Sequence, residues 1–139
     1  MALLAHLKFG DNGNERYEKD YLLLSAKCRY SREYSGTRPR SAIRGIFFTV
    51  EVVAPGSVDL DLYAWYIDDD NREGCIVMEE SSSTESTSAR TIKFENARCI
   101  SINEKYDISE HSKRKLLIEF SATGASTEGL DISCQKRIL

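Results

Sequence analysis

Apolar and polar residues alternate at a period of two along much of this chain, and this alternation limits the folds that the chain can adopt. Successive side chains of a β-strand point to opposite faces of a sheet, so an alternating segment is typical of a strand with one buried face. In the clearest segment, Thr49 and Glu51 lie between apolar residues. The apolar series there is Ile46, Phe48, Val50 and Val52, and an equivalent series is Leu116, Ile118, Phe120 and Ala122.

The same periodicity predicts further strands at residues 3–9, 22–30, 74–78, 91–103 and 130–136. In the first of these, the odd-numbered residues from Leu3 to Phe9 are expected to face inward. In the second, the even-numbered residues from Leu22 to Cys28 are expected to do so. The apolar positions in residues 91–103 change parity and change back, which predicts a bulge or bend near Asn96. They are Ile92, Phe94, Ala97, Cys99, Ile100 and Ile102.

One segment has helical periodicity instead. Ser57 is placed to act as an N-cap and Asp59 falls in the first turn, where a negative charge is favourable. The residues that then share one helical face are Val58, Leu62, Trp65 and Tyr66. This predicts one helix of about three turns that packs against a sheet face or a barrel mouth.

Together these patterns predict a mainly β fold in a single domain over residues 1–139. We expect a small antiparallel β-barrel of about seven to nine strands, with one helix over about residues 57–68 and an extended loop over about residues 31–44. Polar loops are also expected at residues 10–20 and 79–89. The loop at 31–44 is long for a hairpin connection, and loops of that length are usually functional.

Composition narrows the function classes. The formal net charge of −3 argues against binding nucleic acid through bulk charge, and no apolar run is long enough to cross a membrane. The N-terminus lacks the basic residues and apolar core of a signal peptide, so we expect a protein made and folded in the cytoplasm. The four cysteines, Cys28, Cys75, Cys99 and Cys134, form no metal-ligand spacing, and free thiols are expected.

Groups suited to catalysis are scarce. The two histidines, His6 and His111, fall on a polar strand face and in a polar turn, and no nucleophile or phosphate-binding motif is present. Asp68, Asp70 and Glu79 match three positions of a calcium-binding loop, but an arginine occupies a ligand position and the glycine is misplaced. We therefore expect no enzyme, no cofactor and no metal ion.

Charge is distributed unevenly along the chain. Residues 27–44 contain six basic residues and one acidic residue, whereas residues 59–80 contain eight acidic residues and one basic residue. Two solvated faces would explain this pattern. Alternatively, the basic segment of one copy contacts the acidic surface of a neighbour, a heterologous contact that builds rings or stacks.

The order of several short motifs resembles one known family, the haemolysin-coregulated proteins, Hcp or TssD, of bacterial type VI secretion systems. It resembles most the divergent branch found in Bacteroidota, and the resemblance extends over nearly the whole chain. The motifs are LKFG at 7–10, GTRPRS at 36–41, GIFFTVE at 45–51, YAWY at 63–66, TIKFENA at 91–97, YD at 106–107, and the segment 116–125 before Gly129.

This resemblance implies a structural subunit that forms hexameric rings. The rings stack into a tube that is expelled when a surrounding sheath contracts, and effectors can be carried in its lumen. The implied partners are other copies of the chain, the sheath, the baseplate or spike, and effectors, with no nucleic acid and no membrane insertion. The implied location is the cytoplasm before firing and then secretion without a cleavable signal peptide.

The resemblance also assigns roles to two sets of residues. Residues 35–44 match the extended loop that contacts neighbouring protomers and rings, and residues 57–67 match a helix that lies toward the lumen. Taken together with the uneven charge distribution, this gives the candidate interface residues Arg32, Gly36, Arg38, Pro39, Arg40, Arg44, Asp68, Asp69 and Asp70. The lumen-facing residues are Asp59, Asp61 and Tyr63.

Two features depart from the family pattern. The loops at 10–20 and 79–89 look longer and more polar than is typical, and the cysteines are not a family signature. The alternative function is a small β-barrel carrier of an apolar ligand, but Phe48, Phe94 and Phe120 look sufficient to fill a small barrel.

Overall fold

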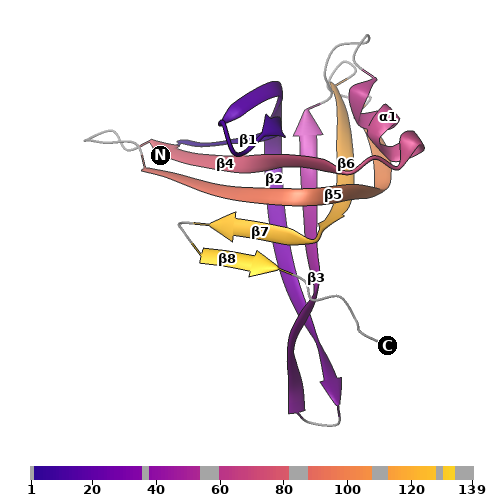
Figure 1. Cartoon of the computed structure of the whole chain (residues 1–139). Helices are drawn as coiled ribbons and strands as arrows, with labels where there is room; N and C mark the ends of the chain where they lie inside the picture. The colour runs from indigo at the N-terminus through magenta and orange to yellow at the C-terminus, as the bar shows by residue number, and fades with distance from the viewer. Residues whose placement is uncertain are drawn as a thin grey trace.

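The computed structural model describes residues 2–35, 38–53, 60–81, 88–107, 113–127 and 130–133. Within these residues the chain forms eight strands and one helix (Figure 1). They are β1 (Ala2–Asp11), β2 (Arg16–Ser35), β3 (Arg38–Val53), α1 (Asp61–Asp68), β4 (Arg72–Ser81), β5 (Ser88–Asp107), β6 (Lys113–Ala122), β7 (Gly124–Thr127) and β8 (Leu130–Ser133).

The strands pair in an antiparallel sheet that closes on itself. Their order is β4-β1-β2-β3-β6-β5-β7-β8, and an additional pairing of β4 with β5 completes the circuit. Residues 98–107 of β5 pair with β6, residues 92–95 of β5 pair with β7, and β8 pairs with β7. Gly74 permits the close approach of β4 to β1, because a Cβ at this position would overlap the carbonyl oxygen of Lys8. The expected fold class, a small antiparallel β-barrel with one helix, is confirmed.

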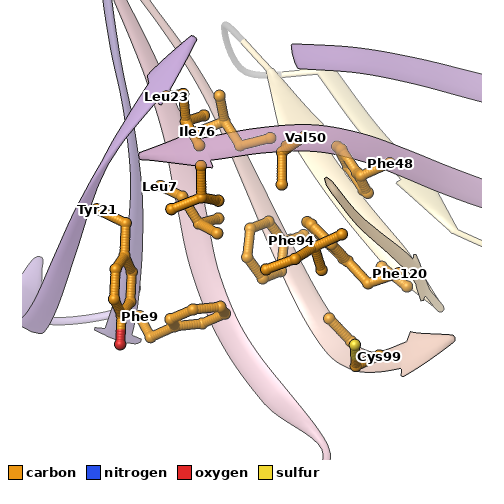
Figure 2. Close-up of a cluster of buried hydrophobic side chains, with 14 of the residues drawn as sticks. Leu7, Phe9, Tyr21, Leu23, Phe48, Val50, Ile76, Phe94, Cys99 and Phe120 are labelled. Carbon is orange, nitrogen blue, oxygen red and sulfur yellow. The ribbon is translucent and has the colours of Figure 1, made fainter. Parts of the chain in front are cut away.

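Aromatic rings fill the centre of the barrel, where side chains from several strands converge (Figure 2). Phe48 and Phe120 stack with ring centroids 4.8 Å apart, and Phe94 lies 5.0 Å from Phe120. Phe9 packs edge-on against Phe94 at 6.1 Å. Such contacts add to the free energy gained by removing large apolar surfaces from water.

The predicted inward faces of β3 and β6 are confirmed, since all eight apolar residues of the two series are buried. The prediction for β2 is wrong at its start. Leu22 and Leu24 are 44% and 51% exposed, while Tyr21 and Leu23 are buried. A register shift between Leu23 and Ser25 makes Leu24 the extra residue of a bulge. Beyond it Ala26 is exposed as well, and of the four residues predicted to face inward only Cys28 packs partly against the core.

The irregularity predicted near Asn96 is present in β5. Asn96 has φ of 51°, and the pairing with β4 shifts between Gly74 and Arg72 at this point. A second shift between Cys99 and Ser101 leaves Ile100 48% exposed, although it was predicted to face inward. Ile102 then returns to the core side, where it is partly buried.

The helix α1 is shorter than expected. It begins at Asp61 with Leu60 as its N-cap residue, which forms no side-chain cap hydrogen bond, and the predicted cap Ser57 lies outside the described residues. Leu62 and Trp65 are buried as predicted, whereas Tyr66 is 48% exposed. In the part of the chain that the structure describes, no helix has the length and hydropathy needed to cross a membrane.

Two of the expected loops are largely strands. Residues 10–20 form a tight connection, because β1 continues to Asp11 and β2 starts at Arg16. The extended loop at 31–44 is a two-stranded hairpin in which Tyr34 pairs with Pro39. We call residues 32–35 of β2 and 38–44 of β3 the ribbon. In the third loop, strand structure extends to Ser81 and resumes at Ser88.

Candidate functional site

Trp65 holds α1 over one end of the barrel. Its side chain is fully buried, and its indole N–H donates to the backbone oxygens of Asp70 at 3.0 Å and Ala97 at 3.1 Å. The ring lies 4.9 Å from that of Phe9 and 5.3 Å from that of Phe120, measured between centroids. Both the polar atom and the apolar surface of this side chain are therefore satisfied inside the protein.

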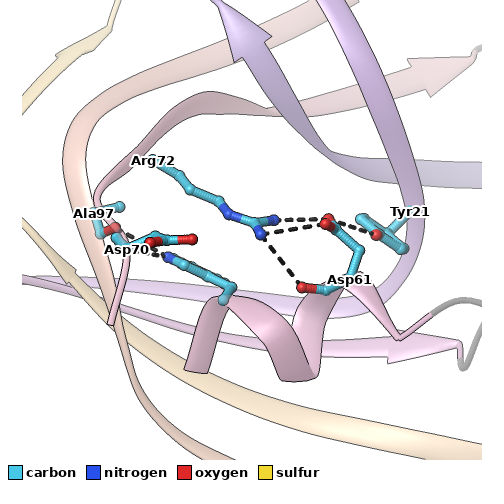
Figure 3. A network of polar contacts seen from close by, with 6 residues as sticks. Tyr21, Asp61, Asp70, Arg72 and Ala97 are labelled. Atoms are coloured by element: carbon cyan, nitrogen blue, oxygen red, sulfur yellow. Dashed lines mark hydrogen bonds and ion pairs between the residues drawn. The ribbon is translucent and has the colours of Figure 1, made fainter. Parts of the chain in front are cut away.

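Arg72 anchors the first turn of α1 (Figure 3). Its Nη1 lies 2.7 Å from Oδ2 of Asp61, and its Nη2 donates to Oδ1 and to the backbone oxygen of the same residue. The guanidinium also lies over the rings of Phe9 and Trp65, at 5.4 Å and 5.6 Å from their centroids. This geometry combines a bidentate ion pair with two cation–π contacts.

The ion pair controls the ionisation of Asp61. Burial alone would raise the pKa of this carboxyl group, but the hydrogen bonds and charge of Arg72 outweigh burial and leave the pKa below its ordinary value. The hydroxyl of Tyr21 also donates to Oδ2 of Asp61 at 3.3 Å. Asp61 was predicted to face a lumen, and the structure places its carboxylate in this internal network.

Tyr63 joins α1 to the second half of β5. Its hydroxyl donates to Oε1 of Glu104, and the hydroxyl of Tyr106 donates to Oε2 of Glu104 at 2.9 Å. Burial, together with the adjacent carboxylate, raises the pKa of Tyr63 to about 12. The two phenols in turn lower the pKa of Glu104. Tyr63, also predicted to be lumen-facing, is thus a half-buried side chain with a fixed partner.

The C-terminal end of α1 exposes both apolar and acidic side chains. Ile67 is 75% exposed and Tyr66 is 48% exposed, and Asp68, Asp69 and Asp70 follow on the surface. We call residues 66–70 the tip. Asp69 has a left-handed backbone and lies 3.9 Å from Nη1 of Arg98, whose Nε donates to Asn71. Arg98 of β5 therefore contacts the tip at Asp69 and the adjoining Asn71.

A shallow hollow lies on the outer face of β2, β3, β6 and β5, where the basic segment begins. Lys27 and Arg29 flank it, and the guanidinium of Arg29 lies 4.8 Å from the ring centroid of Phe47. We call this the basic hollow. Its lining residues are Lys27, Arg29, Phe47, Phe48, Thr49, Ile100, Glu119 and Phe120.

The predicted interface residues occupy two separate parts of the molecule. Asp68, Asp69 and Asp70 lie together in the tip. The backbones of Arg32, Arg38, Pro39, Arg40 and Arg44 belong to the ribbon, which projects well beyond the barrel (Figure 1). Gly36 and Asp59 lie outside the described residues. The roles of these residues at an interface or a lumen stay predictions.

Sequence reasoning missed the two anchors of α1. In the sequence Arg72 is the single basic residue of the acidic segment and the arginine that breaks the calcium-loop match, and its isolation among carboxylates was the available signal for a structural ion pair. Glu104 had no signal, because its partner Tyr63 is 41 positions away in the sequence.

One histidine and three cysteines lie among the described residues. His6 lies on the outer face of β1 with Nδ1 2.7 Å from Oδ1 of Asp20. Cys28, Cys75 and Cys99 are free thiols, and burial raises the pKa of each of them. His111 and Cys134 lie outside the described residues.

Comparisons with known proteins identify the family. The family model described as Hemolysin coregulated protein Hcp (TssD) matches residues 1–135. No curated protein sequence is similar enough to this chain to count as a relative.

Three solved structures illustrate how widely this fold is shared. Hcp1 from Flavobacterium johnsoniae is similar with a TM-score of 0.67 and 20% identity, over 94% of this chain and 98% of that one. Hcp1 from the E. coli EAEC 042 pathovar has a TM-score of 0.65 and 10% identity, over 96% and 97%. The secreted protein Hcp3 from Pseudomonas aeruginosa has a TM-score of 0.58 and 13% identity, over 98% of each chain.

These likenesses agree with the closed barrel, the single helix and the projecting hairpin described above. Because the family model matches nearly the whole sequence, the chain belongs to the haemolysin-coregulated protein family (Hcp, TssD), a family of type VI secretion proteins.

Proposed function

We propose that this chain is a structural tube subunit of a type VI secretion system, which forms hexameric rings that stack into an expelled inner tube. Family membership supports a role in type VI secretion. The observation that carries the assembly is the ribbon, whose strands pair only with each other among the described residues and which extends beyond the barrel (Figure 1). A hairpin in this position can reach a neighbouring copy.

The packing of the barrel supports a structural role over a carrier role. Trp65, Phe48, Phe94 and Phe120 are each at most 1% exposed and contact one another through their rings. No observation favours an apolar ligand inside the barrel. A closed sheet also leaves few exposed strand edges, which suits a subunit that stays dissolved before it assembles.

Charge supports ordered assembly. The tip presents Asp68 and Asp70, whereas residues 27–44 carry six basic residues and one acidic residue, so heterologous contacts between these segments of two copies bring opposite charges together. Exposed pairs are screened over about 8 to 10 Å at physiological ionic strength, so assembly is expected to weaken as salt rises.

The same proposal covers location and cargo. The subunit is made in the cytoplasm, assembles there with sheath and baseplate or spike proteins, and leaves the cell without a cleavable signal peptide when the sheath contracts. Effectors travel within the ring. The chain acts by assembly and performs no catalysis.

The test is the oligomeric state. Light scattering of the purified chain at tens of micromolar in low salt is expected to give the mass of a hexamer, and electron microscopy is expected to show rings. Raising the salt should shift the distribution toward monomer. A chain that stays monomeric and forms no rings in low salt would contradict the proposal.

A further inference from the structure

We propose that the tip of one copy docks in the basic hollow of the next copy, so that this contact links the subunits of the ring. Tyr66 and Ile67 supply the apolar part of the tip, and Asp68 and Asp70 supply its charge. This inference rests on the proposed function, because it names the surfaces through which the chain associates with itself.

The basic hollow is built to receive an apolar and acidic group. Its accessible apolar surface comes from the partly buried Phe47 and the exposed Ile100, because Phe48 and Phe120 are themselves fully buried in the core. Lys27 and Arg29 lie at its edge, and neither makes an ion pair within the described residues. Glu119 is the only acidic lining residue, so cations outnumber anions in the hollow.

Ile100 owes its exposure to a specific feature of β5. The register shift between Cys99 and Ser101 turns this side chain out of the barrel, although the sequence pattern favours the inside. The exposed Ile100, which lines the hollow together with Phe47, leaves apolar surface in contact with water in the isolated protomer. Covering that surface on docking is a source of binding free energy.

The tip has the complementary chemistry. Ile67 is 75% exposed on a helix end that is held rigidly by Trp65, so its docking costs little conformational entropy. Neither Asp68 nor Asp70 makes an ion pair in the part of the chain that the structure describes, whereas Asp69 lies near Arg98. Asp68 and Asp70 are therefore the carboxylates available to Lys27 and Arg29.

The two surfaces cannot satisfy each other within one copy. The residues that line the hollow come from β2, β3, β5 and β6, and none comes from α1. Docking a tip in the hollow of a second copy leaves that second copy with a free tip, so the contact repeats in one direction. A repeat of this heterologous kind closes into a ring or continues as a helix.

Charge exchange provides the test. Variant H carries Lys27→Glu and Arg29→Glu in the hollow, and variant T carries Asp68→Lys and Asp70→Lys in the tip. Each alone is expected to weaken ring formation by about tenfold or more, because like charges then face each other. Combining all four substitutions in one chain restores opposite charges across the contact, and rings are expected to return.

Mixing the two variants gives a second readout. Variant H keeps a normal tip and variant T keeps a normal hollow, so copies of the two variants can alternate around a ring in an equimolar mixture. Tips with Asp68 and Asp70 meet hollows with Lys27 and Arg29 in one pairing, and the two exchanged surfaces meet in the other. Opposite charges then face each other at every contact, so mixed rings with both variants in equal amounts are expected to form, although each variant alone assembles poorly. A mixture that forms no rings while wild type does would overturn the contact.

The controls and outcomes separate this contact from the tube proposal. Glu18→Lys and Lys105→Glu reverse exposed charges outside both surfaces and should leave ring formation unchanged. If the wild-type chain forms rings and variant T forms them equally well, the contact is overturned while the tube proposal stands. If the fourfold variant fails to assemble although it melts at the wild-type temperature, the contact is also overturned. A wild-type chain that remains monomeric overturns both.

Discussion

The helix end of the barrel and the ribbon differ in how they are held. At the helix end, Trp65 connects α1 to β5 by a hydrogen bond and to β6 by a ring contact, and the ion pair of Arg72 with Asp61 connects α1 to β4. The strands of the ribbon pair with each other and, among the described residues, with no other strand. One region thus adds to the stability of the protomer, and the other is available for contacts beyond it.

This difference suggests that the residues that stabilise the protomer and the residues that mediate assembly lie in different regions of the chain. Substitutions at the helix end are expected to lower the free energy of unfolding, whereas substitutions in the ribbon are expected to change assembly at constant stability. The predictions below test that separation, from the largest expected effect on stability to the smallest.

The largest effect is expected for Phe120→Ala. The ring of Phe120 contacts Phe48, Phe94 and Trp65, and truncation leaves a cavity where the core meets α1. The expected loss in the free energy of unfolding is about 3–5 kcal/mol, measured by urea unfolding. On the same strand, Leu117→Ala removes a side chain that is 36% exposed and should cost far less. Equal losses for the two variants would contradict the described core.

A smaller loss is expected for Arg72→Met, which keeps the aliphatic stem and removes the charge. Asp61 then keeps a half-buried carboxylate without its cation, and the expected loss is about 2–3 kcal/mol. Arg98→Met is the matched control, because Arg98 and Asp69 are both more than half exposed and their pair is worth at most about 1 kcal/mol. A loss from Arg98→Met as large as that from Arg72→Met would remove the distinction between them.

The same ion pair predicts a dependence on pH. Because the pKa of Asp61 is lower in the folded chain than its ordinary value of 3.8, the pair stabilises the fold above that value, and the stabilisation is lost as pH falls through the folded pKa. The destabilisation caused by Asp61→Asn is therefore expected to be full near pH 7 and to shrink below about pH 4. Unfolding curves of both proteins across this range measure it.

Asp68→Asn serves as the comparison for that titration, since Asp68 is exposed and makes no ion pair among the described residues. Its effect on the free energy of unfolding should be small at every pH. A difference between wild type and Asp61→Asn that stays constant from pH 7 to below pH 4 would contradict the role of the ion pair.

The smallest effect on stability is expected in the ribbon. Arg38→Glu combined with Arg40→Glu should change the free energy of unfolding by no more than about 0.5 kcal/mol, as for surface substitutions in general. The same variant is expected to weaken ring or stack formation in light scattering. Unchanged assembly at an unchanged melting temperature would remove the ribbon from the mechanism.

Much of the barrel could be predicted from the sequence because alternation reports burial directly. It succeeded in β3 and β6, where polar residues separate the apolar ones. It failed at the start of β2, where Tyr21, Leu22, Leu23 and Leu24 are all apolar and no parity can be read. The choice between the two faces is made there by the pairing of Leu23 with Val52 and by the bulge at Leu24.

The candidate site was less predictable because its contacts are distant in sequence. Charge counts located the acidic and basic segments, but they could not show that Asp61 is used internally by Arg72. Nor could periodicity reveal that Ile100 points outward, since a bulge moves the register by one residue and reverses the face. Both outcomes depend on strand pairing that forms only in the assembled sheet.

The position of β1 between β2 and β4 has a consequence for how the chain folds. Leu7 pairs with Tyr21 on one side and with Ile76 on the other. The barrel can therefore close around β1 only after β4 has been synthesised. Pairings between segments so distant in sequence slow folding, typically to milliseconds or seconds, whereas a hairpin such as β2–β3 forms within about 10 μs. A newly made chain therefore exposes the free edge of β1 until synthesis has passed Ser81, and this interval is when it is most vulnerable to aggregation.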